Sequence, residues 1–105
     1  MELEGQNRIE NAIGAYDEVA YSSRGRAYGR LGQLERKIQD YDEAIRLDPQ
    51  LALGYSNRGA AYSGLSQLKR AIEGLDEAIR LDPQVASAYA NRAMAYTLLG
   101  KDKAA

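Results

Sequence analysis

Two pairs of adjacent carboxylates could act as acid and base, and they are Asp42 with Glu43 and Asp76 with Glu77. Paired carboxylates can divide proton transfer between them in hydrolytic reactions. Arg46 and Arg80 follow at helical spacings of three and four residues, where surface ion pairs form. The chain contains no histidine and no cysteine, which removes the commonest general base and the thiolate ligands of metal sites. We therefore expect a protein that is not an enzyme, with no catalytic residues, no cofactor and no metal site.

A glycine-rich stretch at residues 25–32 reads GRAYGRLG and superficially matches a loop that binds phosphates. Such a loop needs a strand before it and a turn into a helix after it. The pattern around this stretch is helical on both sides, so we interpret its glycines as sites of close helix packing.

Five cationic side chains lie close together around this stretch: Arg24, Arg26, Arg30, Arg36 and Lys37. A nucleic-acid surface combines such charge with stacking aromatic rings on an open face. The whole chain, however, has a net charge of −1, and Arg24 returns later at Arg58 and Arg92 as part of a repeat. We interpret the cluster as a solvated basic face that suits an acidic peptide better than a nucleic acid.

Neither a membrane span nor a leader is indicated by the sequence. No apolar run approaches the roughly 20 residues that cross a bilayer, and no basic-then-apolar segment opens the chain. We expect a cytoplasmic protein that binds neither membranes nor nucleic acids.

The elements that must position these side chains come from an internal repeat. The letters DEAIRLDPQ at residues 42–50 return unchanged at residues 76–84, which is 34 residues later. The same offset aligns several further sets, which are Tyr21, Tyr55 and Tyr89; Arg24, Arg58 and Arg92; Gly25, Gly59 and Ala93; and Tyr28, Tyr62 and Tyr96. A repeat of this length is typical of units that stack on copies of themselves.

Each repeat unit is predicted to be a helical hairpin. The second half of a unit is apolar along one helical face at Leu68, Ala71, Ile72, Leu75, Ala78 and Ile79. In the first half, a small residue between two tyrosine rings allows another helix to approach closely. Gly32 and Gly64 break the helical pattern between the two halves. Asp48 and Asp82 are predicted to cap the helix that follows each unit.

On these residues the chain resembles the tetratricopeptide repeat family. The family pattern of an aromatic residue, glycine, tyrosine, alanine and proline falls in register on Tyr55, Gly59, Tyr62, Ala71 and Pro83, and the match covers residues 19–105. The resemblance implies an all-α, right-handed solenoid of helical hairpins that binds other proteins without catalysis. Lys37 departs from the pattern, because alanine is usual there; either its stem reaches water or the first hairpin is splayed.

The unit boundaries predict a single domain whose register breaks near its start. Residues 1–5 are consistent with an expression-derived start, and residues 6–19 resemble the second helix of a hairpin whose first helix is missing. Unit 1 covers residues 20–50, unit 2 covers residues 51–84, and an incomplete unit 3 covers residues 85–105. About nine residues of the usual linker are missing before residue 20. We expect residues 7–31 to run together as one long helix; the alternatives are a frayed N-terminus or a turn near Asp17 and Glu18. The near-identity of the units suggests a consensus-like array that was engineered or truncated.

The incomplete ends and the family resemblance each predict an interaction surface. The first is self-association into a dimer or larger oligomer, with domain swapping, in which incomplete ends cover each other through Ile9, Ala12, Ile13, Tyr16, Val19, Tyr89, Met94, Tyr96 and Leu99. The alternative, implied by the resemblance, is peptide binding in a concave groove lined by Ser22, Arg26, Arg30, Leu53, Ser56, Asn57, Ser87, Asn91 and Met94.

Some members of the family clamp the C-terminal carboxylate of heat-shock chaperones. Asn57 matches one residue of that clamp, whereas Ser22 and Arg26 stand where the family has lysine and asparagine. We therefore do not expect the full clamp here.

Overall fold

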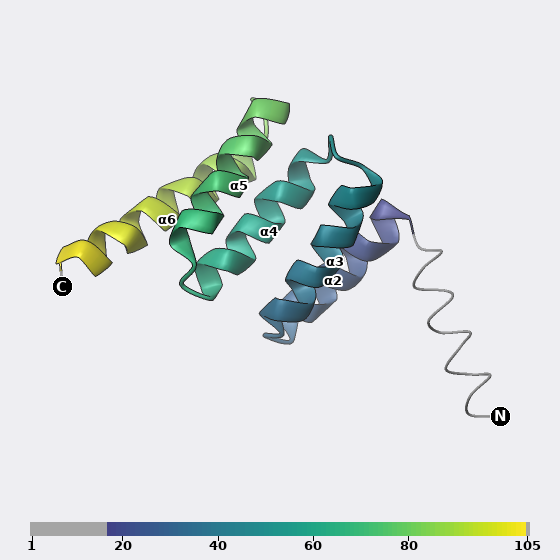
Figure 1. Cartoon of the computed structure of the whole chain (residues 1–105), viewed down its shortest axis with the longest axis horizontal. Coiled ribbons are helices and arrows are strands. Elements are labelled where there is room, and N and C mark those ends of the chain that lie inside the picture. Colours follow the sequence, from purple (N-terminus) through teal and green to yellow (C-terminus); the bar gives the residue numbers. More distant parts are fainter. Residues whose placement is uncertain (1–16, 105) are drawn as a thin grey trace.

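The computed structural model describes residues 17–104 of the chain, and side chains as far as residue 101. These residues form five α-helices and no strand, and the helices are α2 (Glu18–Arg30), α3 (Leu34–Leu47), α4 (Ala52–Gly64), α5 (Leu68–Leu81) and α6 (Ala86–Ala104). Each helix packs on the next, and α4 also packs on α6. Figure 1 shows α2 and α3 at one end of the row and α6 at the other. The predicted all-α solenoid is confirmed.

The two hairpins turn at the same repeat position with different residues. Gly32, after α2, has φ +75°, and Ser66, after α4, has φ 61°. Left-handed backbone suits glycine, but it strains a residue with a Cβ. The prediction that Gly64 breaks the second hairpin is wrong by two positions, since α4 still includes Gly64.

Asp48 and Asp82 close the preceding helices. The carboxylate of each accepts the backbone N–H two residues later, at 3.1 Å from Gln50 and 2.9 Å from Gln84. The next helices begin only at Ala52 and Ala86. The predicted role as N-cap is therefore wrong, because each aspartate lies too far before the helix to reach its first N–H groups.

α2 begins with a true cap. Asp17 has an extended backbone, with φ −84° and ψ 178°, and its side chain accepts the N–H of Ala20 at 2.8 Å. One continuous helix over residues 7–31 is therefore wrong at this position, because α2 begins at Glu18 behind its cap. The alternatives of a frayed N-terminus or a turn near Asp17 and Glu18 stay predictions. Residues before Asp17 lie outside the described part of the chain.

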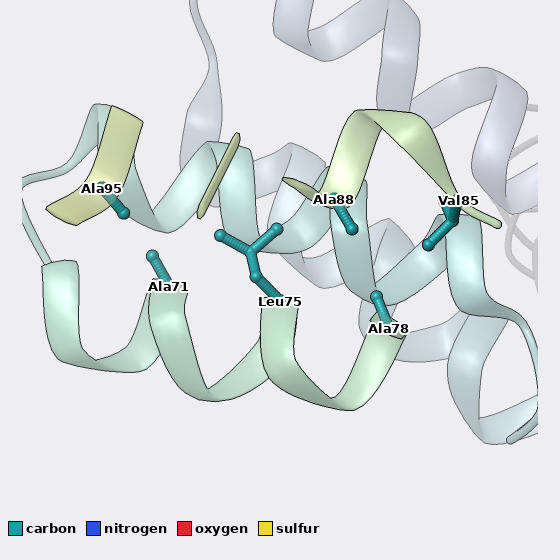
Figure 2. Close-up of a cluster of buried hydrophobic side chains, with 6 residues drawn as sticks. All are labelled: Ala71, Leu75, Ala78, Val85, Ala88 and Ala95. Atoms are coloured by element: carbon teal, nitrogen blue, oxygen red, sulfur yellow. The ribbon is translucent and has the colours of Figure 1, made fainter. Parts of the chain in front are cut away.

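The core joins α5 to α6 through small side chains. Figure 2 shows Leu75 at its centre, with Ala71 and Ala78 on α5 and Ala88 and Ala95 on α6. On the other side of Leu75, a Cβ at Gly59 of α4 would lie 2.8 Å from the Leu75 Cγ. Burying such a leucine contributes roughly 1.5–3 kcal/mol. The small residues let three helices share it.

The first hairpin accommodates Lys37 without opening. Gly25 still lies against Tyr41, where a Cβ would be 3.1 Å from the ring carbon Cε2. The Lys37 stem folds over Gly29, and a Cβ there would be 3.0 Å from both Cδ and Nζ. Unit 2 has Ser63 and Ala71 at these two positions. Glycine at position 29 thus makes room for the lysine, and the splayed alternative is wrong.

Candidate protein-interaction surfaces

The predicted groove residues lie on the first helices of the three units, and we call this surface the first-helix face. On α2, Arg26 and Arg30 are exposed, and neither forms an ion pair with a described residue. Ser22 on α2 is half-buried, as is Asn57 on α4, while Leu53 remains 55% exposed. The basic part of this face is therefore confined to α2.

Ser56 does not belong to an accessible surface. It is fully buried, and its Oγ lies 3.0 Å from the Oγ of Ser87. The Asn91 Nδ2 donates to Ser56 Oγ at 3.3 Å and to its carbonyl oxygen at 3.4 Å. The predicted role of Ser56 in peptide contact is wrong, because this side chain instead ties α4 to α6. Ser87 stays exposed and Asn91 half-exposed.

Beneath this face lies the hydroxyl of Tyr41. It is buried beside Asn57 and makes no hydrogen bond of normal geometry with a described group. Burial raises the pKa of Tyr41, and the nearby charge of Arg26 opposes that rise. Beneath the first-helix face, the neutral phenol of Tyr41 therefore lies next to the exposed Arg26.

The second predicted surface includes one side of α6 that no described helix covers. Tyr89 is 42% exposed and Tyr96 is 53% exposed, whereas Tyr21, at the equivalent position of unit 1, is 2% exposed. Ala93 between them is also exposed. We call these three residues the open face of α6. In the two complete hairpins the same positions are packed against α3 or α5.

The other predicted members of this surface lie elsewhere. Met94 is 58% exposed, but two residues at about 100° each place it on the opposite side of α6 from Tyr96. Leu99 is half-buried on the side that faces the core. Val19 is 64% exposed on α2, at the far end of the solenoid. Ile9, Ala12, Ile13 and Tyr16 lie outside the described residues.

Ion pairs explain the acidic residues first considered for catalysis. Glu43 pairs with Arg46 and Glu77 with Arg80 inside their own helices, as predicted. Hydrogen bonds from each arginine lower the pKa of its glutamate. Within the described chain, no group of acidic side chains could hold a metal ion.

Asp42 and Asp76 have a different role, which the sequence reasoning missed. Asp42 pairs with Arg58 at 2.7 Å, and Asp76 pairs with Arg92 at 2.9 Å, so each arginine reaches back to the preceding hairpin. A regular spacing in the sequence could have revealed these pairs, because both partners are separated by 16 residues and both pairs recur with the repeat.

None of the described helices is long and apolar enough to span a bilayer.

Comparison with known proteins agrees with this architecture. Sequence models described as TPR repeat and Tetratricopeptide repeat match residues 25–66 and 52–85. A search among curated protein sequences gives no match.

Several solved structures are similar along most of the chain. The second TPR of Spaghetti (RPAP3) bound to the HSP90 peptide SRMEEVD is 33% identical, with 80% of this chain and 78% of that chain covered and a TM-score of 0.76. The second TPR domain of human RPAP3, in complex with the HSP70 peptide SGPTIEEVD, is 34% identical, with 79% and 69% covered and a TM-score of 0.74. The TPR2B domain of yeast Sti1, in its pHsp70 complex, is 30% identical, with 80% and 67% covered and a TM-score of 0.78. The chain is a protein-interaction module that belongs to the tetratricopeptide repeat family.

Proposed function

We propose that this module is non-catalytic and self-associates, with the N-terminal segment of one copy covering the open face of α6 of another. The observation that carries the proposal is the exposure of Tyr89 and Tyr96 at positions that a second helix covers in both complete hairpins. Burying a large side chain that is now exposed contributes roughly 1.5–3 kcal/mol, before the entropy of ordering the partner is subtracted. Two half-exposed tyrosines therefore supply a modest driving force.

The proposed occupant is residues 6–16 of a second copy. Ala12, Ile13 and Tyr16 have the spacing of Ala71, Ile72 and Leu75, which belong to or pack against the core cluster. In its own chain this segment joins α2, at the opposite end of the solenoid from α6 (Figure 1). That separation favours docking on a different copy.

Light scattering at two protein concentrations tests the proposal. We expect an average mass above the 11.6 kDa of one chain that rises with concentration. Replacing Tyr89 and Tyr96 by serine, or removing residues 1–14, should return the mass to that of one chain. Met94→Ser, on the opposite side of the same helix, is the matched control and should leave association unchanged. A wild-type mass of one chain at both concentrations would contradict self-association.

Peptide capture on the first-helix face is the second candidate, since three similar structures are described with HSP90 or HSP70 peptides or in a pHsp70 complex. The exposed Arg26 and the half-exposed Asn57 would contact an acidic peptide. We expect the double replacement of Arg26 and Asn57 by alanine to weaken an acidic peptide about tenfold or more, which is about 1.4 kcal/mol, while leaving the mass unchanged. Fluorescence anisotropy of a labelled EEVD peptide measures this. Equal affinity of the wild type and the double variant would reject the assignment.

A cytoplasmic location and an engineered or truncated origin stay predictions from the sequence.

A further inference from the structure

A pocket of about 360 Å³ lies between α4 and α5, away from both surfaces described above. Tyr55, Arg58 and Tyr62 of α4 form one side, and Arg70, Glu73 and Gly74 of α5 form the other. The guanidinium of Arg58 lies 5.4 Å from the ring centre of Tyr55 and 6.0 Å from that of Tyr62. An arginine held between two rings is oriented before any ligand arrives.

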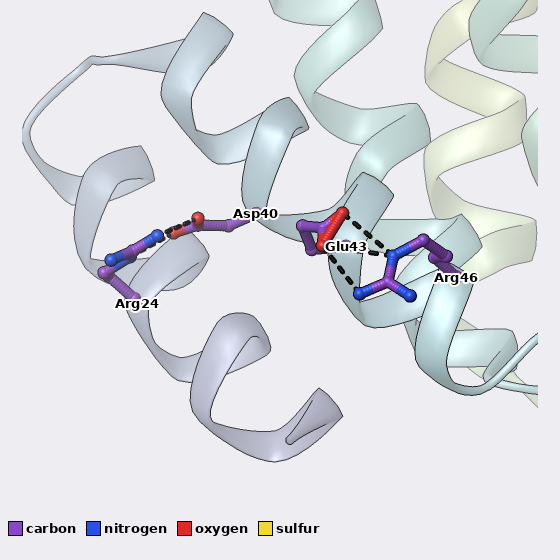
Figure 3. A network of polar contacts seen from close by, with 4 residues as sticks. All are labelled: Arg24, Asp40, Glu43 and Arg46. Carbon is purple, nitrogen blue, oxygen red and sulfur yellow. Dashed lines mark hydrogen bonds and ion pairs between the residues drawn. The ribbon is translucent and has the colours of Figure 1, made fainter. Parts of the chain in front are cut away.

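The equivalent place in unit 1 is filled by a carboxylate of the chain itself. Arg24, which corresponds to Arg58, lies 5.7 Å and 5.8 Å from the rings of Tyr21 and Tyr28. Its Nε donates to Asp40 Oδ2 at 2.8 Å and its Nη2 to Oδ1 at 2.6 Å, as Figure 3 shows. Asp40 is only 3% exposed. Unit 1 therefore demonstrates that this frame of two tyrosines and an arginine accommodates a buried carboxylate.

Unit 2 keeps the frame and lacks the carboxylate. Gly74 stands 34 residues after Asp40, so no side chain enters the pocket from that position. Arg58 turns its Nη1 to Asp42 of α3, at 2.7 Å. Its Nε and Nη2 donate no hydrogen bond to any residue that the structure describes. These are the same two nitrogens with which Arg24 holds Asp40.

We propose that the pocket of unit 2 is a carboxylate-binding site, in which Nε and Nη2 of Arg58 grip the ligand as Arg24 grips Asp40. A bidentate arginine–carboxylate pair is among the stronger polar contacts and fixes the orientation of the acid. Arg70, 5.6 Å from the Tyr62 ring, adds a second positive charge to the lining. The site takes either the acidic side chain of a protein segment or a small free acid.

Glu73 limits the affinity of this site. Its counterpart in unit 1 is the neutral Gln39, so unit 2 places a like charge near the ligand. Glu77 also lines the pocket, but it is paired with Arg80. Glu73→Gln copies unit 1 at this position and should tighten carboxylate binding about two- to fivefold, the usual size of an exposed charge effect.

The chain also offers a variant that fills the site. A Cβ at Gly74 would approach nothing closer than 3.7 Å, the Tyr55 carbonyl oxygen, so a side chain fits there. Gly74→Asp should place a carboxylate on Arg58 as in unit 1 and abolish binding of an added acid. Gly100→Asp introduces the same residue where a Cβ meets nothing within 4 Å and serves as its control.

NMR titration at constant ionic strength tests the proposal with three probes: acetate, N-acetyl-aspartate amide and N-acetyl-asparagine amide. We expect saturable shifts of the Arg58 Nε–H and Gly74 N–H signals with one or both acids and none with the asparagine probe. A response to acetate alone identifies a free acid as the ligand, and a response to the aspartate probe identifies an acidic side chain. The absence of saturation with both acids, an equal response to the asparagine probe, or a response that survives Gly74→Asp would overturn the proposal. None of these outcomes depends on self-association.

Discussion

Glycines that look alike in the sequence have unequal roles in the structure. Gly59 lies under Leu75, where a Cβ would be 2.8 Å from Cγ of Leu75 and 3.2 Å from the carbonyl oxygen of Ala71. Gly100, in the last turns of α6, has nothing within 4 Å of such a Cβ. The first glycine is required by packing, and the second only weakens its helix.

We expect Gly59→Ala to lower the free energy of unfolding by about 1–3 kcal/mol, the usual cost of overpacking. Gly100→Ala, the matched control, should leave it unchanged or raise it by up to about 1 kcal/mol through helix propensity. Urea unfolding followed by circular dichroism measures both. Equal stabilities of the two variants would show that α5 can move away from α4 without cost.

Lys37 is a second residue whose effect on stability depends on its surroundings. Burial lowers the pKa of Lys37 below its ordinary value of 10.5. Between the lowered pKa and 10.5 the unfolded chain binds more protons than the folded chain, so this group makes stability rise with pH in that window.

Lys37→Met keeps the apolar stem and removes the charge. We expect the variant to be more stable than the wild type at pH 7, with the difference shrinking as the pH approaches 10. Chemical unfolding at both pH values provides the measurement. A difference that stays constant with pH would mean that packing, and not desolvation of the ammonium group, sets the cost of Lys37.

Among the elements, the two hairpin turns differ in strain. Gly32 and Ser66 occupy the same repeat position and both have positive φ, but only Ser66 has a Cβ that this conformation crowds. The first turn is therefore formed by a suitable residue, and the second is held by the helices around it.

Ser66→Gly should raise the free energy of unfolding by about 0.5–1 kcal/mol, since relief of strain is partly offset by the greater freedom of glycine in the unfolded chain. Gly32→Ser is the reverse change in the other hairpin and should lower stability by a similar amount. Thermal unfolding of both variants beside the wild type tests the pair. A destabilised Ser66→Gly protein would contradict this account of the turn.

The whole molecule is a row of hairpins in which each unit contacts its neighbours, so its stability is close to a sum of local and nearest-neighbour terms. The pairs Arg58–Asp42 and Arg92–Asp76 join consecutive hairpins, but their aspartates are about half exposed, and each pair should contribute under about 1 kcal/mol. The apolar contacts within and between hairpins carry more, and the open face of α6 lacks the contact with a second helix of its own hairpin.

If copies cover that face for each other, the folded state is stabilised by mass action. We expect the melting temperature to rise by a few degrees for each tenfold increase in protein concentration, because a domain of this size shifts by about 4–8 °C per kcal/mol. The Tyr89→Ser, Tyr96→Ser protein should melt at one temperature at all concentrations. A wild type with an equally flat response would argue against association in the folded state.

The helical hairpins, their repeat and most of the core could be predicted without coordinates, because apolar spacing and small residues act through local backbone periodicity. Gly59, Leu75 and Ala71 could be assigned to the close contact of two helices from spacing alone. The missing linker before residue 20 was also visible in the sequence, but only the structure showed that the helix begins at Glu18, capped by Asp17, instead of continuing from residue 7.

Which polar groups face water and which face another helix became visible only once the hairpins were packed together. The burial of Ser56 and the reach of Arg58 back to Asp42 depend on how far one hairpin is rotated against the next. The pocket beside Gly74 depends on how α4 and α5 pack within one hairpin. Local periodicity does not specify that rotation, because it results from the packing of side chains contributed by separate units.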